Sequence, residues 1–206
     1  MIRSDIFVIL DDAQFSKGDF HNRNRIKTKD GPKWLTIPVH AKKNPINEIR
    51  INKEFTFSKM KWNEYHIHLL EENYSKTPFF DSVFNELNTI YLKEAYENLI
   101  DINMNIIKFL KDAFNIDTPI YLSSELNLNG ELKSTERLIE ICNHFEANQY
   151  LSGKDGPKYM NMKLFEEANI DVIIQNYTPE PYHQPFGEFT PYMTALDSLF
   201  NNGTLR

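Results

Sequence analysis

Four short apolar runs, each followed by polar residues, limit the fold of this chain more than any other feature. The first is Ile6–Leu10, which stops at Asp11 and Asp12. It is rich in β-branched and aromatic residues and shows no polar alternation, as expected of a strand buried on both faces of a parallel sheet. The other runs lie at residues 119–122, 149–151 and 171–175. We therefore expect a parallel sheet built from these four strands.

Helical segments separate these runs. A helix is expected from Ser134 to about Phe145, and another begins at Pro157, where the missing N–H of proline costs nothing. Residues from about 58 to 114 repeat apolar side chains at helical spacing, with a break at Pro78. The sequence thus predicts one α/β domain over residues 1–206. Its expected architecture is a three-layer, Rossmann-like parallel sheet with the helical segment of residues 58–114 inserted in the middle.

Two further strands and a long irregular segment complete this expectation. Trp34–Val39 follows a Gly-Pro turn and predicts a strand, and Asn47–Ile51 alternates as a shorter strand. Tyr177–Pro191 is rich in proline and aromatic residues, and proline suits neither a helix interior nor a central strand. Irregular segments of about fifteen residues tend to be functional or disordered, and the aromatic residues argue against disorder. A short helix at Met193–Phe200 is expected to follow.

Composition excludes several classes of protein. The net charge is −6, whereas proteins that bind genomic DNA usually present a basic surface, so we expect no genomic nucleic acid partner. A single cysteine, Cys142, cannot form a disulfide within the chain and falls on the apolar face of its helix, which favours a buried thiol. No apolar run is long enough to span a bilayer, and no signal peptide is visible. A cytoplasmic protein is therefore expected.

Polar residues at the ends of the four runs are the first candidates for a site, because ligands of open parallel sheets bind beyond the carboxyl ends of the strands. The candidate residues at these ends are Asp11, Asp12, Gln14, Lys17, Glu125, Ser152 and Gly153. Asp11 and Asp12 suit a divalent cation or a general base, or else one caps a turn and the other is solvated. The turn after Ser152 is a weak anion site, and a tight turn that requires positive φ explains its glycines equally well.

Alternation in Asn22–Arg25 would direct two guanidinium groups to one side of an extended segment. Arg23 and Arg25 would then suit phosphate or carboxylate, with Asn24 between them, although a solvated loop is the alternative. In the proline-rich segment, His183 is the candidate general acid or base, with Tyr182 and Gln184 beside it as candidate binding residues. No spacing of ligand residues predicts a metal site.

Motifs along the chain resemble those of the WbqC-like family. They are the stretches Ser4–Phe15, Asn22–Lys27, Trp34–Val39, Asn73–Tyr74, Pro78–Phe80, Thr135–Leu138, Tyr150–Gly153 and Tyr182–Gly187. The resemblance covers nearly the whole chain. One departure is the absence of the upstream strand and the His-Gln-Pro type motif with which members of that family usually begin. We expect an exposed sheet edge in its place, which would allow pairing in a homodimer.

The resemblance implies a transferase of surface-polysaccharide (O-antigen) biosynthesis, because a glycine transferase role has been suggested for that family. Its substrates would be a sugar nucleotide and an amino-acid donor, with an amino-acyl or acyl group transferred to an amino sugar. In this scheme Arg23 and Arg25 hold phosphate or carboxylate, and Asp11 or His183 deprotonates the amine. A nucleotidyl-transferring or adenylating enzyme and a non-catalytic sugar-nucleotide-binding module are the alternatives. No cofactor is predicted beyond a nucleotide-linked substrate.

Overall fold

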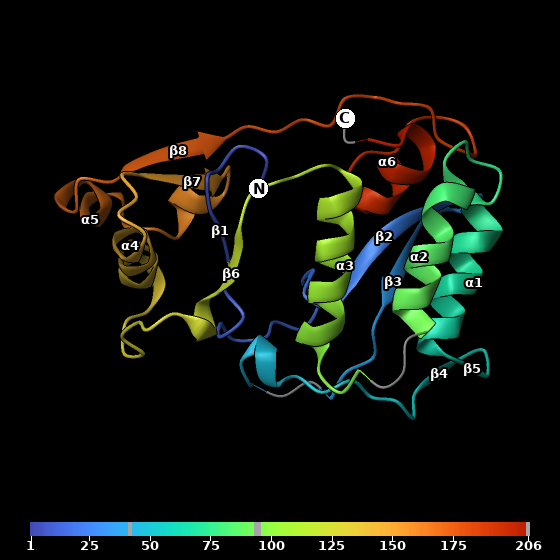
Figure 1. Cartoon of the computed structure of the whole chain (residues 1–206), viewed down its shortest axis with the longest axis horizontal. Coiled ribbons are helices and arrows are strands. Elements are labelled where there is room, and N and C mark those ends of the chain that lie inside the picture. The colour runs from blue at the N-terminus through green and yellow to red at the C-terminus, as the bar shows by residue number, and fades with distance from the viewer. Residues whose placement is uncertain (41–42, 93–95, 205–206) are drawn as a thin grey trace. The chain divides into compact units, whose positions relative to one another are not determined.

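The computed structural model describes residues 1–40, 43–92 and 96–204 and has a mixed α/β fold (Figure 1), which confirms the predicted class. The chain divides into two compact units. Unit 1 comprises Met1–Leu10 and Thr118–Thr178, and unit 2 comprises Asp11–Asp117 and Pro179–Arg206. Each unit contains its own cluster of buried hydrophobic side chains. That residues 1–206 form a single domain stays a prediction.

Unit 1 contains all four strands of the predicted parallel core. They are β1 (Phe7–Ile9), β6 (Ile120–Leu122), β7 (Gln149–Gly153) and β8 (Asp171–Gln175). β1 pairs in parallel with β6, and β7 pairs in parallel with β8. Among the described residues these pairs form separate two-stranded sheets. The helical elements are η2 (Ser123–Glu125), α4 (Ser134–His144), η3 (Gly156–Lys158) and α5 (Met162–Glu167).

The turn after β7 shows why a glycine stands at position 156. A Cβ atom added there would lie 1.9 Å from Ser152 Oγ and 2.9 Å from Met160 Cε. The φ of Gly156 is not positive, so close approach rather than a left-handed backbone requires the glycine. Pro157 occupies the first turn of η3, as expected, but that 3-10 turn is short and the helix α5 begins only at Met162. Cys142 is buried in the same unit, as predicted, and burial raises the pKa of its thiol.

Unit 2 combines two β-hairpins, β2–β3 and β4–β5, with four α-helices in the described residues. Its elements are β2 (Arg23–Thr28), β3 (Gly31–Thr36), η1 (Ile46–Glu48), β4 (Thr56–Phe57), β5 (Met60–Lys61), α1 (Trp62–Tyr74), α2 (Phe80–Leu92), α3 (Leu99–Ala113) and α6 (Ala195–Asn202). Figure 1 shows α1, α2 and α3 packed in sequence order, with α6 against α2 and α3. Ile26 of β2 is fully buried in this core, which fixes the face of the hairpin that points inward.

Two local predictions in unit 2 are wrong. Residues 46–48 form the 3-10 helix η1 instead of part of a strand, and only Arg50 and Ile51 make isolated bridges. The helical segment does not begin near residue 58, because Ser58 and Lys59 have positive φ and form the turn of the β4–β5 hairpin. The predicted strand Trp34–Val39 is displaced and observed as Gly31–Thr36. The helices predicted over the rest of residues 58–114 are confirmed, except that residues 93–95 lie outside the described residues.

His66 is a buried titratable group of α1. Its side chain packs against the rings of Trp62 and Tyr91, and its Nε2 atom lies 3.1 Å from the carbonyl oxygen of Thr36. Burial lowers the pKa of His66 to about 4, although the hydrogen bond to Thr36 acts in the opposite direction. The folded protein therefore holds this imidazole neutral at pH values where the unfolded chain protonates it.

We expect unit 2 to lose stability as the pH falls from about 6.5 to about 4, because the unfolded state binds the extra proton in that window. The contribution of His66 to this loss is about 3 kcal/mol. Urea unfolding followed by tryptophan fluorescence reports on unit 2, which contains both tryptophans, Trp34 and Trp62. His66→Gln should flatten the pH dependence, and the exposed His68 provides the control, His68→Gln. Equal pH dependence in both variants would contradict the assignment.

Candidate functional site

The β2–β3 hairpin presents two arginines on the face opposite the buried Ile26. Alternation along β2 puts Ile26 in the core and leaves Arg23 and Arg25 on the other face, as the sequence predicts for an extended segment. Trp34 of β3 pairs directly with Arg25 in the antiparallel register. The Cζ atoms of Arg23 and Arg25 lie 4.1 and 5.6 Å from the centre of the Trp34 ring. Two guanidinium groups therefore converge on one indole.

The charges of these arginines are not neutralised within the described part of the chain. Neither guanidinium pairs with a carboxylate there, and both Nε atoms are buried without a hydrogen-bond partner. Their terminal nitrogens donate to backbone carbonyls, that of Arg23 to Gly18 and that of Arg25 to Tyr192 at 3.1 Å. These bonds orient the two groups without supplying negative charge. The arrangement suits an anion with several acceptor oxygens.

The segment before β2 carries the first group of predicted site residues. Asp11 is 1% exposed, and its carbonyl and carboxylate oxygens accept from the backbone and side chain of Asn47 at 2.9 and 3.2 Å. Asp12 is half-buried, whereas Gln14 and Lys17 are exposed. Asp11 thus accepts from a residue 36 positions further along the chain, and the choice between its two interpretations stays a prediction.

A buried carboxylate, that of Asp197 in α6, organises the C-terminal part of unit 2. Asp197 Oδ2 accepts from Tyr74 Oη at 2.6 Å. Its Oδ1 accepts from Tyr182 Oη and from Gln184 Nε2, each at 2.7 Å. The Tyr74 hydroxyl also accepts from the backbone N–H of Lys27 at 2.9 Å. Helices α1 and α6, strand β2 and the proline-rich loop are therefore joined through one carboxylate.

Burial, followed by the negative charge of Asp197, raises the pKa of Tyr74, so this phenol stays a hydrogen-bond donor. The buried charge of Asp197 is satisfied by hydroxyl and amide donors, as a desolvated carboxylate requires. Tyr182 and Gln184, which the sequence marks as candidate binding residues, thus point to Asp197. Their contacts make them anchors of the loop.

The loop is held at further points along β2. The buried Nζ of Lys27 donates to the carbonyl oxygens of Gly187 and Glu188. The backbone N–H of Thr194 donates to the Arg25 carbonyl at 2.7 Å. Close to these contacts Phe186 and Tyr192 adopt positive φ of 63° and 61°, which is uncommon for residues with a side chain. The segment is therefore an ordered structure with local strain.

His183 lies between the two anchoring residues Tyr182 and Gln184. Its side chain is exposed, whereas Gln184 is 2% exposed. The loop thus presents the imidazole to solvent while its neighbours point inward. Whether His183, Asp11, Asp12, Arg23, Arg25 and Ser152 surround one cleft stays a prediction.

Three predicted site residues belong to unit 1. Ser152 is 3% exposed, and its hydroxyl donates to the Gly153 carbonyl at 3.2 Å. Gly153 and Glu125 are exposed. Ser152 and Gly153 stand at the carboxyl end of β7, and Glu125 follows β6 in η2, so the predicted placement at strand ends is confirmed for these three residues.

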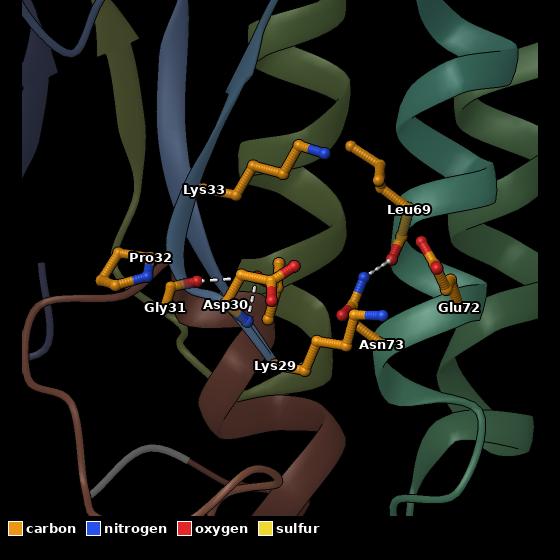
Figure 2. A pocket seen from close by; sticks show the side chains of 9 residues that line it. Lys29, Asp30, Gly31, Pro32, Lys33, Leu69, Glu72 and Asn73 are labelled. Atoms are coloured by element: carbon orange, nitrogen blue, oxygen red, sulfur yellow. Dashed lines mark hydrogen bonds between the residues drawn. The ribbon is translucent and has the colours of Figure 1, made fainter.

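A pocket of about 440 Å³ lies at the turn of the β2–β3 hairpin, opposite α1 (Figure 2). Lys33 extends from β3 toward α1, and Glu72 and Asn73 approach from the helix. None of the predicted site residues lines it. Because lysines and carboxylates alternate around this pocket, its charges largely cancel, and the Arg23–Arg25 face is the better anion site.

Sequence reasoning missed Trp34, Asp197 and Tyr74 as residues of the site. A signal for Asp197 was present, since an aspartate lies among apolar residues in the helix that contains Leu196, Leu199 and Phe200. Trp34 was assigned to a strand, but the hairpin register that places it beside Arg25 depends on the turn at Lys29–Asp30. No cluster of three metal-ligating side chains occurs in the residues that the structure describes. Within those residues no helix has the length and apolar character to traverse a bilayer.

A comparison with protein families matches residues 1–206 to the WbqC-like protein family. The chain is also 35% identical over 201 residues to a protein of Mycobacterium tuberculosis (strain ATCC 25618 / H37Rv) named uncharacterized protein Rv1507c. That alignment covers 97% of this chain and 84% of the relative. No solved structure matches the chain. The protein thus belongs to the WbqC-like family, which confirms the resemblance of its motifs.

We expect Asp197→Ala to destabilise unit 2 by about 3 kcal/mol or more, because Tyr74, Tyr182 and Gln184 would lose a common charged acceptor. Tyr182→Phe removes one of these donors and should cost about 1.5 kcal/mol. Urea unfolding and proteolysis of the loop around residue 186 measure the two effects. Asn202→Ala, on the same helix, is the control. A loop that stays protease-resistant in Asp197→Ala would show that the carboxylate does not hold it.

Proposed function

We propose that this protein is a transferase of surface-polysaccharide biosynthesis that binds a nucleotide-linked amino sugar and adds an amino-acyl or acyl group to its amine. Membership of the WbqC-like family is consistent with a role related to polysaccharide biosynthesis. The observation that carries the proposal is the pair Arg23 and Arg25, which converge on Trp34 with no carboxylate partner among the described residues. We assign the phosphates of the substrate to this pair.

In the proposed reaction the sugar amine attacks the carbonyl carbon of an activated acyl donor. A new C–N bond forms, the bond to the leaving group breaks, and a base removes a proton from the amine. His183 is the better base of the two predicted candidates because its side chain is exposed, whereas Asp11 is 1% exposed and accepts from Asn47. Ser152, Gly153 and Glu125 remain candidate binding residues for donor or acceptor.

The finer description of the fold belongs to this proposal. We infer a three-layer, Rossmann-like arrangement from the parallel pairing of β1 with β6 and of β7 with β8, together with the helices α4 and α5 that follow β6 and β7. Polar residues follow these strands at their carboxyl ends, where such folds bind nucleotides. An experimental structure with bound uridine diphosphate tests both the arrangement and the position of the phosphates.

We expect Arg23→Ala to weaken binding of uridine diphosphate by about 1.5–3 kcal/mol, the usual value of a hydrogen bond to a charged group. Arg23→Lys should recover only part of this loss, because an ammonium cannot bind phosphate in bidentate fashion. Isothermal titration calorimetry at constant ionic strength measures the affinities. Lys53→Ala removes an exposed cation elsewhere in unit 2 and is the matched control. Equal affinities in all these variants would refute the role of the pair.

His183→Gln and Asp11→Asn separate catalysis from stability. We expect His183→Gln to lower turnover about 10²–10⁴-fold with an unchanged melting temperature, because an exposed base is lost. Asp11→Asn should instead lower stability by about 1–3 kcal/mol, because the buried carboxylate that accepts from Asn47 becomes an amide. The mass of a uridine-diphosphate amino sugar, incubated with an activated glycine donor, reports turnover. Full turnover in His183→Gln would exclude this histidine as the base.

Binding of the uridine-diphosphate amino sugar by the wild-type protein without any change in the mass of that sugar would favour a binding module.

A further inference from the structure

Exposed aromatic rings flank the arginine pair on the same face of unit 2. Phe20 is 62% exposed, and its ring centre lies 5.5 Å from that of Trp34, which is itself 38% exposed. On the other side, Arg25 donates to the carbonyl oxygen of Tyr192, a residue that is 54% exposed. These contacts connect Phe20, Trp34, Arg23, Arg25 and Tyr192 into one continuous surface, which we call the Arg–aromatic face.

Hydrogen bonds from the arginine pair fix the backbone at Tyr192 and in the turn that contains Phe20. Tyr192 adopts a φ of 61°, and its position is fixed by the Arg25 bond and by the nearby bond from Thr194 N–H to the Arg25 carbonyl. Phe20 stands in the turn whose Gly18 carbonyl accepts from Arg23. Large rings kept in water by a strained and hydrogen-bonded backbone indicate a surface that binds a partner.

We propose that the Arg–aromatic face docks on a membrane surface that carries anionic headgroups. This inference rests on the phosphate-binding role proposed for Arg23 and Arg25, and a lipid headgroup and the phosphates of the substrate would compete for the same two guanidinium groups. Trp34 and Tyr192 combine an apolar ring with a polar N–H or O–H group, and such rings are enriched at the level of the headgroups, while Phe20 adds a purely apolar ring. The guanidinium groups of Arg23 and Arg25, which lie between these rings, bind the phosphates of the lipid headgroups.

The charges of the face distinguish a membrane from other partners. Two copies of the face related by a two-fold axis would bring four guanidinium groups together, which opposes self-association. A long nucleic acid would need more phosphate contacts than two arginines provide in a chain of net charge −6. An anionic bilayer needs only a few cations beside rings that can enter it.

Sedimentation with vesicles tests the proposal. The intact chain is mixed with vesicles of phosphatidylcholine alone or with 30% phosphatidylglycerol, about a third of the lipid as in anionic membranes. We expect binding to the anionic vesicles that weakens with added salt, and little binding to the neutral ones. Phe20→Ser combined with Tyr192→Asn should weaken vesicle binding about ten-fold. Asparagine is chosen because it tolerates the positive φ of residue 192.

Controls separate the outcomes. Phe55→Ser removes a ring that is 45% exposed elsewhere in unit 2 and should leave vesicle binding unchanged. The two-ring variant should keep its melting temperature and its affinity for uridine diphosphate, whereas Arg23→Ala combined with Arg25→Ala should lose about 25-fold in vesicle binding, about five-fold for each arginine.

Absence of vesicle binding, or unchanged binding in the two-ring variant, overturns the docking proposal. Vesicle binding that depends on the rings without any affinity for uridine diphosphate overturns the nucleotide proposal instead. Oligomers that disappear in the two-ring variant would assign the face to a second copy.

Discussion

The carboxylate of Asp197 is the interaction on which the candidate site of unit 2 depends. It accepts from Tyr74 of α1 and from Tyr182 and Gln184 of the loop, and Tyr74 in turn accepts from the backbone of β2. A desolvated carboxylate is unfavourable unless hydrogen bonds replace the lost water. The buried carboxylate is therefore stable only with these hydrogen-bond donors, and the donors are held in place by the carboxylate. This mutual requirement ties four segments that are distant in the sequence into one arrangement.

Fixed contacts hold the proline-rich loop in one conformation, and this favours a preformed site over a closing lid. A proline-rich lid that closes over a substrate would need few fixed contacts in its open form. Here Gln184 is buried, Lys27 binds the carbonyls of Gly187 and Glu188, and Thr194 bonds to Arg25. Such contacts favour a preformed surface in which His183 has a set position. Preformed positions lower the entropy lost on binding, which suits a site that must orient a reactive amine.

The sequence predicted the elements with strong local signals and failed where tertiary contacts decide. The strands β1, β6, β7 and β8 were found because each contains a short apolar run that ends at polar residues, which is a local signal. Residues 47–51 alternate like a strand, yet Asn47 and Glu48 belong to the 3-10 helix η1, where Asn47 bonds back to Asp11 and Ile46 to Ala13. Arg23 and Arg25 were recognised by alternation alone. Trp34 was not recognised as their partner, because the hairpin register is set by a two-residue turn that the pattern does not specify.

Tyr182 and Gln184 show most clearly why a motif does not reveal the role of each residue in it. Both belong to the stretch that carries the family resemblance, and the sequence assigned both to substrate binding. Their donors are directed at Asp197, thirteen or more residues further along the chain. His183 between them, and the rings of Phe186 and Tyr192 beyond, are exposed. The anchors have to be buried in order to hold the loop, and the groups that meet a ligand have to be exposed. The segment therefore needs both kinds of residue side by side, and burial alone distinguishes them.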